Sequence, residues 1–219
     1  MKEGLEEILN RCSLLMARKG YYGTSMRDLA KETGYSLSGL YNYFKSKEEL
    51  LFLINLHGFS AISSTLRVML EKLDEPEERM YALIYNHIKY FLAHMNEMRV
   101  LMLGTQNLDV ERSATIRDLK EEYRQQGQLI VADLFRAKTG KKLSKKELEK
   151  KTLLLFGMMN WVFGWYSPRM HGTADDLIDD IYSLFLRGLL VEREKVPNVD
   201  GIKKVYEANK TKFFLAEAN

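Results

Sequence analysis

The sequence predicts an all-α protein, and three observations carry that prediction. Apolar residues recur at the spacing that one face of a helix requires, for example at Ile8, Cys12, Leu15 and Met16. Proline, which interrupts helix interiors, occurs only 3 times in 219 residues. No long stretch alternates apolar and polar residues as a half-buried strand does. Helices are therefore expected along the whole chain.

The first three expected helices form one N-terminal unit, at 3–19, 25–33 and 36–43. Thr24 or Ser25 can cap the second helix, and Gly34 supplies the left-handed residue that ends it. Ser36 caps the third helix, in which Leu40 faces the core.

The remaining expected helices lie at 47–73, 76–95, 97–104, 110–138, 145–166 and 174–193, which makes roughly nine in all. Ser46, Ser144 and Thr173 precede three of them, each followed three residues later by a carboxylate, and this is the pattern of a capping box. The tail at 197–219 loses the apolar periodicity but keeps several large apolar residues, so we expect it to pack on the body or on a partner chain.

Composition excludes several classes of protein. The net charge is only +3, so charge alone does not indicate a nucleic-acid partner. The single cysteine, Cys12, excludes a disulfide framework and fits a reducing cytoplasm. The acidic start has no apolar segment of a signal peptide. The longest nearly apolar run, 153–166, falls short of the roughly 20 residues that cross a bilayer. We therefore expect a cytoplasmic protein with no membrane partner.

The most informative segment of the chain runs from Thr24 to Leu50. Two short helices joined by a glycine turn have the geometry of a helix-turn-helix, whose second helix enters the major groove of DNA. The continuation Tyr41-Asn42-Tyr43-Phe44-Lys45-Ser46-Lys47-Glu48-Glu49-Leu50, preceded by Gly-Tyr-Tyr-Gly-Thr-Ser, resembles the signature of TetR-family transcriptional repressors over about residues 8–51. The resemblance implies a DNA-binding domain at 1–46, a helical ligand-binding and dimerisation domain at 47–196, and a tail at 197–219.

The residues expected to contact double-stranded operator DNA lie on this motif. Tyr hydroxyls, a Lys at a helix start and the Thr24 hydroxyl or amide suit phosphate oxygens, and Arg27 can reach a base edge or a phosphate. The expected set is Thr24, Arg27, Ser36, Leu37, Ser38, Gly39, Tyr41, Asn42, Tyr43 and Lys47. Leu37, Ser38 and Gly39 depart from the residues common in the family, so direct base readout is expected to be sparse and DNA shape to contribute.

The helical body carries no catalytic or metal-binding constellation, and we expect neither an enzyme nor a cofactor. Its central helices are rich in aromatic residues and Met, with a few embedded polar side chains, which is a composition that suits a core or a chamber for a small hydrophobic ligand. The expected ligand-binding residues are Tyr85, Phe91, Met102, Thr105, Tyr123, Phe156, Asn160, Trp161 and Trp165.

Two stretches near the end of the body, 155–168 and 181–189, resemble a subgroup of TetR-family repressors that respond to acyl-CoA thioesters. The resemblance implies an acyl-CoA-like effector, with Asn160 meeting the thioester or a headgroup. It also implies a homodimer through helices 145–166 and 174–193. A lysine-rich segment at 138–151 could attract phosphates, although a solvated loop is the simpler interpretation.

Three alternatives remain open from the sequence. A drug-responsive or efflux-type repressor would bind cations and prefer buried carboxylates, for which Glu97 and Glu121 are the nearest candidates. A helical enzyme acting on acyl thioesters would need a base and a nucleophile within reach of each other. A helical adaptor with an aromatic groove for a peptide would not protect operator DNA.

Overall fold

The structure of the chain is a computed structural model that describes residues 4–102, 106–190 and 199–215, without the side chains of Met102 and of residues 209–215. All regular elements within these ranges are helices, and the all-α prediction is confirmed. The head contains α1 (Leu5–Lys19), α2 (Met26–Thr33) and α3 (Leu37–Tyr41). The rest contains α4 (Lys47–Leu70), α5 (Pro76–Ala93), α6 (Met95–Met102), α7 (Val110–Thr139), α8 (Lys145–Asn160), the 3₁₀ turn η1 (Trp161–Gly164), α9 (Pro168–His171), α10 (Ala174–Leu190) and α11 (Val199–Leu215).

Local capping sets where the head's helices begin and end. Ser25 and Asp28 form a reciprocal capping box at α2, and Gly34, at φ 77°, ends that helix in the left-handed conformation. The Ser36 side chain caps α3 by accepting from the backbone N–H of Gly39 at 3.0 Å. The helix-turn-helix expected from the sequence is therefore present, with a recognition helix of only five residues.

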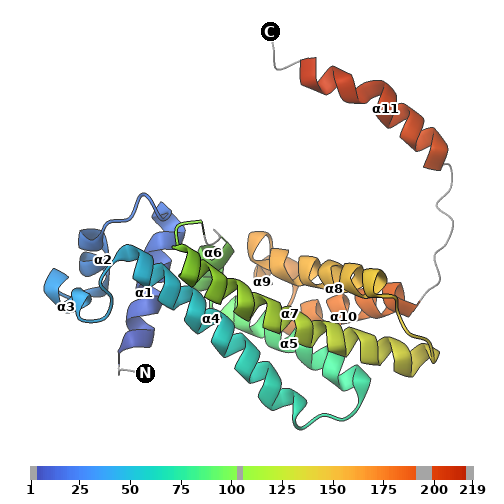
Figure 1. Cartoon of the computed structure of the whole chain (residues 1–219), viewed down its shortest axis with the longest axis horizontal. Coiled ribbons are helices and arrows are strands. Elements are labelled where there is room, and N and C mark those ends of the chain that lie inside the picture. Colours follow the sequence, from blue (N-terminus) through green and yellow to red (C-terminus); the bar gives the residue numbers. More distant parts are fainter. Residues whose placement is uncertain (1–3, 103–105, 191–198, 216–219) are drawn as a thin grey trace.

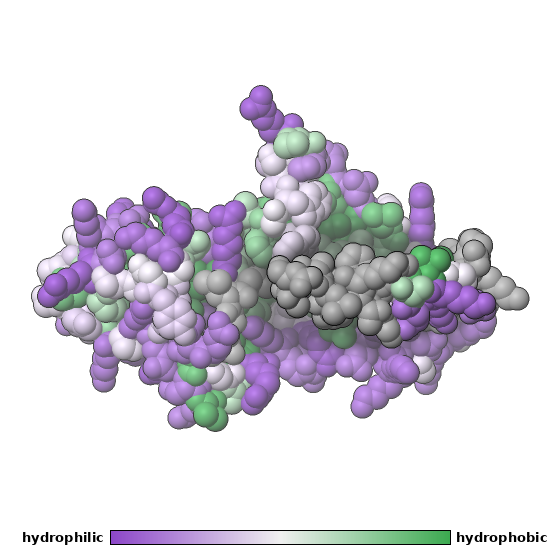
Figure 2. Space-filling view, turned by 90° about the horizontal axis from the view of Figure 1, so that it is seen from above, coloured by the Kyte–Doolittle hydropathy of each residue, from purple (hydrophilic) through white to green (hydrophobic). Residues whose placement is uncertain are grey.

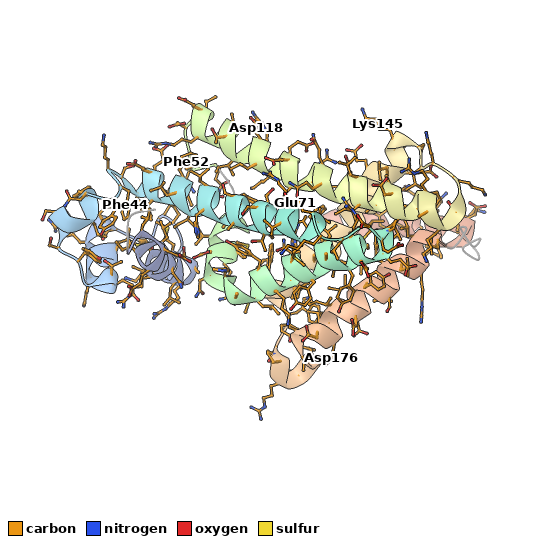
Figure 3. All side chains as sticks on the ribbon, turned by 90° about the horizontal axis from the view of Figure 1, so that it is seen from below. Phe44, Phe52, Glu71, Asp118, Lys145 and Asp176 are labelled. Carbon is orange, nitrogen blue, oxygen red and sulfur yellow. The ribbon has the colours of Figure 1, made fainter. Side chains whose placement is uncertain are left out.

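The body is a bundle built around α4, α5 and α7, with α8 and α10 packed against it (Figure 1). α4 leaves the head near Phe44, passes Phe52 and ends next to Glu71, partway along the bundle and beside α7 (Figure 3). One continuous apolar core joins head and body, since Leu50 and Ile54 at the start of α4 belong to the same cluster as the core of the head. The head and the body are therefore mechanically connected.

The capping boxes predicted for the later helices are largely confirmed. Ser144 with Glu147, and Thr173 with Asp176, each bond reciprocally at a helix start. Ser46 accepts from the backbone N–H of Glu49, but the Glu49 carboxylate accepts from the Lys45 amide at 2.6 Å instead of returning to Ser46.

One expected helix is too long, and one of the two placements expected for the tail is not found. The helix expected at 145–166 ends at Asn160, because residues 161–164 tighten into a 3₁₀ turn and Pro168 starts a separate short helix. The tail, whose sequence lacks a clear periodic pattern, contains the helix α11, and Figure 1 shows it apart from the bundle, so its described part does not pack on the body. Packing of the tail on a partner chain stays a prediction.

α4 is long and apolar enough to meet the criterion for a membrane-crossing helix. In this fold 44% of that window is buried inside the protein, where Leu50, Ile54, Ile62 and Leu66 pack in the core. Its apolar character is therefore accounted for by its place between α5, α6 and α7.

Candidate functional site

The exposed face of the head is formed by α3 and its flanks. Ser36, Ser38, Tyr41 and Asn42 are exposed there, and Arg27 on α2 is exposed as well. Tyr41 keeps 45% of its surface accessible although it lies within a helix that packs on the core. This cluster of hydroxyl, amide and guanidinium groups can donate to phosphate oxygens and base edges.

Other residues predicted to contact DNA are half-buried. Leu37 packs against the core, and the Tyr43 ring packs edge-on against Tyr35 with 5.7 Å between ring centroids. A hydrogen bond with Tyr43 raises the pKa of the Tyr35 hydroxyl. A Cβ at Gly39 would lie 3.1 Å from Ser36 Oγ, which explains why a residue without a side chain suits this tight first turn.

Thr24 and Lys47 hold the turn before α2. Thr24 is 1% exposed, its hydroxyl donates to the Gly20 carbonyl at 2.8 Å, and its amide donates to the Tyr21 carbonyl. The expectation that Thr24 offers a donor to phosphate is therefore wrong, because both of its donors are used inside the protein. The Lys47 ammonium donates to the carbonyls of Tyr21 at 2.7 Å and Thr24 at 2.8 Å, and lies 4.2 Å from the Tyr21 ring centroid. Two of its three donors are thereby used to join α4 to the head.

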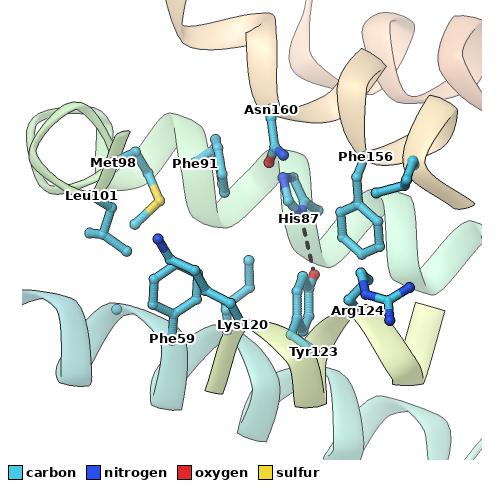
Figure 4. Close-up of a pocket in the computed structure, with 13 residues that line it drawn as sticks. Phe59, His87, Phe91, Met98, Leu101, Lys120, Tyr123, Arg124, Phe156 and Asn160 are labelled. Carbon is cyan, nitrogen blue, oxygen red and sulfur yellow. Dashed lines mark hydrogen bonds between the residues drawn. The ribbon is translucent and has the colours of Figure 1, made fainter. Parts of the chain in front are cut away.

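The body contains a largely apolar cavity of about 280 Å³ between α4, α5, α6, α7 and α8 (Figure 4). It is lined by Gly58, Phe59, Ile62, His87, Phe91, Met98, Leu101, Lys120, Tyr123, Arg124, Leu153, Phe156 and Asn160. Its volume is slightly below the roughly 300–1,000 Å³ of typical small-molecule sites, and apolar walls with a few polar groups are their usual composition.

A buried polar pair forms part of the cavity wall. His87 Nδ1 on α5 lies 3.3 Å from the Tyr123 hydroxyl on α7, and the two residues are 2% and 4% exposed. Burial lowers the pKa of His87 to about 3, and a hydrogen-bonding interaction with the Asn160 side chain opposes this only in part. His87 is therefore a neutral imidazole at physiological pH.

Two cations lie at the edge of the cavity. The Lys120 ammonium is 5.2 Å from the ring centroid of Phe59, and burial lowers the pKa of Lys120. Arg124 Nε donates to Glu121 at 2.7 Å, while its Nη1 is buried without a hydrogen-bond partner in the part of the chain that the structure describes. No carboxylate lines the cavity within the described ranges.

Four of the residues predicted to bind ligand line this cavity, namely Phe91, Tyr123, Phe156 and Asn160. Three do not. Tyr85 is exposed on α5, stacked with Tyr81 at 6.4 Å, and Trp161 and Trp165 lie on the outer surface with 64% and 45% exposure. Thr105 and the side chain of Met102 lie outside the described residues.

The sequence pattern alone assigns no role to His87, Lys120 or Arg124. For His87 a usable signal exists, since it lies one helical turn from Phe91 and among apolar residues of α5, which predicts an inward-facing imidazole. Lys120 and Arg124 lie on α7, and the polar pattern of that helix alone does not indicate which of its turns faces the cavity.

The outer faces of α8 and α10 form a shallow apolar groove, on the side of the bundle where Figure 2 shows hydrophobic surface. Leu153 and Leu154 on α8, Trp161 directly after α8 and Leu184 on α10 are each more than half exposed there. A Cβ at Gly157 would have no neighbour within 4 Å, so the helix backbone itself is open on this face. An apolar patch of this kind on one protomer is typical of an association surface.

Comparison with known proteins matches both parts of the chain to one family. Residues 8–54 match the model of the bacterial regulatory proteins of the tetR family, and residues 73–189 match the tetracyclin repressor-like C-terminal domain.

Curated relatives are similar over part of the chain. The HTH-type transcriptional regulator HbdR of Aromatoleum sp. (strain CIB) is 24% identical over 118 residues, which is 54% of this chain and 52% of HbdR. The uncharacterized HTH-type transcriptional regulator YfiR of Bacillus subtilis (strain 168) is 33% identical over 91 residues, which is 42% of this chain and 40% of YfiR. The chain thus spans about half the length of the curated relatives it matches.

Solved structures share the whole architecture. The TetR-family regulator PfmR from Thermus thermophilus has a TM-score of 0.73 and 25% identity, over 85% of this chain and 99% of that one. AibR, solved with isovaleryl coenzyme A and operator DNA, has a TM-score of 0.69 and 22% identity, over 82% of this chain and 96% of that one. Since the two family matches cover the helix-turn-helix and most of the helical body, the chain belongs to the TetR family of transcriptional regulators and is not an enzyme.

Proposed function

We propose that the protein is a cytoplasmic, homodimeric repressor that leaves its operator when a small hydrophobic effector, an acyl-CoA thioester, fills the cavity of each protomer. One observation carries this proposal: the helices that wall the cavity are the helices that support the head. Gly58 on α4 and Met98 and Leu101 on α6 line the cavity, while α6 packs on α1 and α4 begins at the head.

The proposed route of coupling runs through α4 and α6. A Cβ at Gly58 would lie 3.3 Å from Leu101, so the two helices are in close contact at the cavity wall. An occupant that separates them displaces α1 and the start of α4, and with them the recognition helix α3. Couplings between effector and DNA sites are typically about 1–3 kcal/mol.

The DNA surface that we propose centres on Arg27, Ser38, Tyr41 and Asn42, which are exposed around α3. Ser36, Leu37, Gly39 and Tyr43 then contribute through backbone or partial contact, and Lys47 keeps one donor for a phosphate. The assignment predicts that Arg27→Ala reduces the salt slope of operator binding by about 1, the change expected when one phosphate contact is lost. Fluorescence anisotropy at about 50 to 300 mM salt, where counterion release dominates the salt dependence, measures this slope. An unchanged slope would show that Arg27 does not contact a phosphate.

The effector class follows from the charge and shape of the cavity. An acyl chain suits the aromatic and Met walls, and Asn160 with His87 supplies polar partners inside them. Lys120 at the edge, together with the Arg124 Nη1 that Glu121 does not bind, favours an anionic headgroup and disfavours the cationic drugs of the alternative function. Neither of the two carboxylates considered for a cation site is available to bind a cationic ligand in the cavity. Glu121 pairs with Arg124, and the buried Glu97, 3.2 Å from His94, does not line the cavity. The relative AibR, whose structure holds isovaleryl coenzyme A, supports the same class.

We propose that the dimer surface is the apolar groove over α8 and α10. From the sequence, this surface is expected on longer helices, at 145–166 and 174–193. An isologous contact there would set two recognition helices toward successive major grooves, about 34–36 Å apart. Leu154→Glu with Leu184→Glu is expected to yield a monomer in light scattering, with far-UV circular dichroism unchanged. A dimer that persists in the double variant would place the interface elsewhere.

The decisive experiment titrates thioesters into a protein–operator complex. The operator is first selected from a random duplex library, and butyryl-, hexanoyl- and decanoyl-CoA are then added, with free CoA as the control. We expect at least one thioester to dissociate the complex at concentrations where free CoA does not. If none of the three does so, the acyl-CoA assignment fails while the family assignment stands.

A further inference from the structure

His87 and Tyr123 form a fixed pair in the wall of the cavity. The His87 ring stacks on Phe91 with 4.1 Å between centroids, and both members of the pair meet Phe156 edge-on at 5.8 and 5.6 Å. Rings held on several sides cannot turn to search for other partners. The orientation of the two imidazole nitrogens is therefore set by the packing.

The hydrogen-bond count of the pair decides which nitrogen carries the proton. The buried Tyr123 hydroxyl must donate, and His87 Nδ1 at 3.3 Å is the acceptor in hydrogen-bond contact with it among the described residues. The Asn86 side chain also stabilises the charged form of the Tyr123 oxygen, as a donor to it does. If Tyr123 donates to Nδ1, the single proton of a neutral imidazole sits on Nε2.

His87 Nε2 is a buried polar atom with no well-aligned hydrogen bond in the described part of the chain, although the Asn160 side chain lies close enough to raise the His87 pKa in part. Figure 4 shows the ring between the Tyr123 hydroxyl on one side and the Asn160 amide on the other, at the wall of the cavity. A buried N–H without a partner is rare in folded proteins, and at a cavity wall it indicates a group that an occupant satisfies.

We propose that His87 is a specificity-determining residue, whose Nε2–H binds the carbonyl oxygen of the effector together with the Asn160 amide. The proposal rests on the cavity being the effector site of the proposed function, and adds which atom of the effector is recognised. Tyr123 acts as a positioning residue, because it holds the proton on Nε2 without touching the effector oxygen.

This arrangement distinguishes ligands by one atom. An acyl thioester offers a carbonyl oxygen, whereas an S-alkyl thioether of the same length offers a methylene and leaves the N–H buried and unpaired. An unpaired buried donor costs about 1–3 kcal/mol, which corresponds to about a 5- to 150-fold difference in affinity.

The test compares matched ligand pairs on the full-length protein by isothermal titration calorimetry. Butyryl-, hexanoyl- and decanoyl-CoA are each paired with the S-alkyl-CoA of equal chain length. We expect the wild type to bind the thioester about 5- to 150-fold more tightly than its thioether. His87→Leu should lower this ratio to the part that Asn160 supplies, by weakening thioester binding, and Tyr123→Phe should lower it less, since the proton can then move to Nδ1.

Phe59→Leu is the matched control, because it alters an apolar part of the same wall. It should weaken thioester and thioether alike and leave their ratio unchanged. Nitrogen-15 NMR of histidine-labelled protein supplies a second readout, with the His87 tautomer protonated at Nε2 in the wild type.

Three results separate the possible failures. A wild-type ratio near 1, or a ratio that His87→Leu leaves unchanged, overturns the role of His87 while leaving acyl-CoA binding intact. Protonation at Nδ1 in the wild type overturns the tautomer on which the role depends. If no thioester binds at any chain length, the proposed function itself fails, and the role of His87 fails with it.

Discussion

His87 makes the stability of this protein depend on pH, because its pKa differs between the folded and the unfolded chain. In the fold its pKa is about 3 because it is buried, whereas the unfolded chain binds a proton near pH 6.5. Between these values the unfolded state holds more protons than the native state, so stability is lost as the pH falls.

The magnitude follows from the two pKa values. The full difference corresponds to about 5 kcal/mol, reached near pH 3, at about 1.4 kcal/mol for each tenfold change in proton activity. Lowering the pH from 7 to 5 engages only part of it and destabilises the fold by about 2 kcal/mol. Asp28 and Glu121, whose hydrogen bonds hold their pKa values at about 2, do not titrate in that window.

The assay is urea unfolding at pH 7, 6 and 5, at one fixed protein concentration because a dimer's stability depends on it. His87→Gln, which cannot take up a proton there, is the matched control. Burial raises the pKa of Glu97, whose own contribution to stability therefore falls as pH rises, but Glu97 is present in both proteins and cancels in the comparison. The wild type should lose about 2 kcal/mol more than the variant between pH 7 and 5. Parallel pH profiles for the two proteins would show that His87 is not buried as a neutral group.

Three substitutions, with Gly157→Ala as a control, test the packing described above. Gly127→Ala places a Cβ 2.8 Å from the Phe156 ring and should destabilise the fold by about 1–3 kcal/mol in urea unfolding, whereas Gly157→Ala, with no neighbour within 4 Å, should not. Equal effects of these two glycine variants would contradict the close approach of α7 and α8. Thr24→Val removes a buried hydroxyl donor and should lower stability by about 1 kcal/mol, as measured by thermal unfolding, without changing the salt slope of operator binding. Lys47→Met removes the ammonium donor from the Thr24 carbonyl and leaves the Tyr21 carbonyl with the Thr24 amide as its donor, so it should lower the melting temperature even without DNA. A melting temperature unchanged in Lys47→Met would mean that this lysine serves the DNA alone.

Much of the fold is predictable because its signals are local. The caps at Ser25, Ser144 and Thr173 and the left-handed Gly34 fix helix ends through contacts within four residues, so a single sequence contains them. The helix expected at 145–166 is too long because its apolar run continues through Trp161, and periodicity does not distinguish an α turn from the tighter 3₁₀ turn.

The site is predictable only in part because its contacts are not local. Phe91, Tyr123, Phe156 and Asn160 come from three helices, and the aromatic pattern alone indicates burial without saying which turns meet at a cavity. Trp161 belongs to the same aromatic pattern yet lies on the surface. In a sequence, an apolar residue that contacts a partner chain cannot be distinguished from one that packs in the core.

The bonds of Lys47 to the turn before α2 mean that the head cannot pivot independently of α4. With 24 residues, α4 is about 36 Å long. A tilt of about 5° at its far end would therefore carry the whole DNA-reading unit about 3 Å sideways. In the proposed dimer two such displacements would add to about 6 Å, against a spacing of about 34 Å between successive major grooves, so the two recognition helices would no longer fit successive grooves.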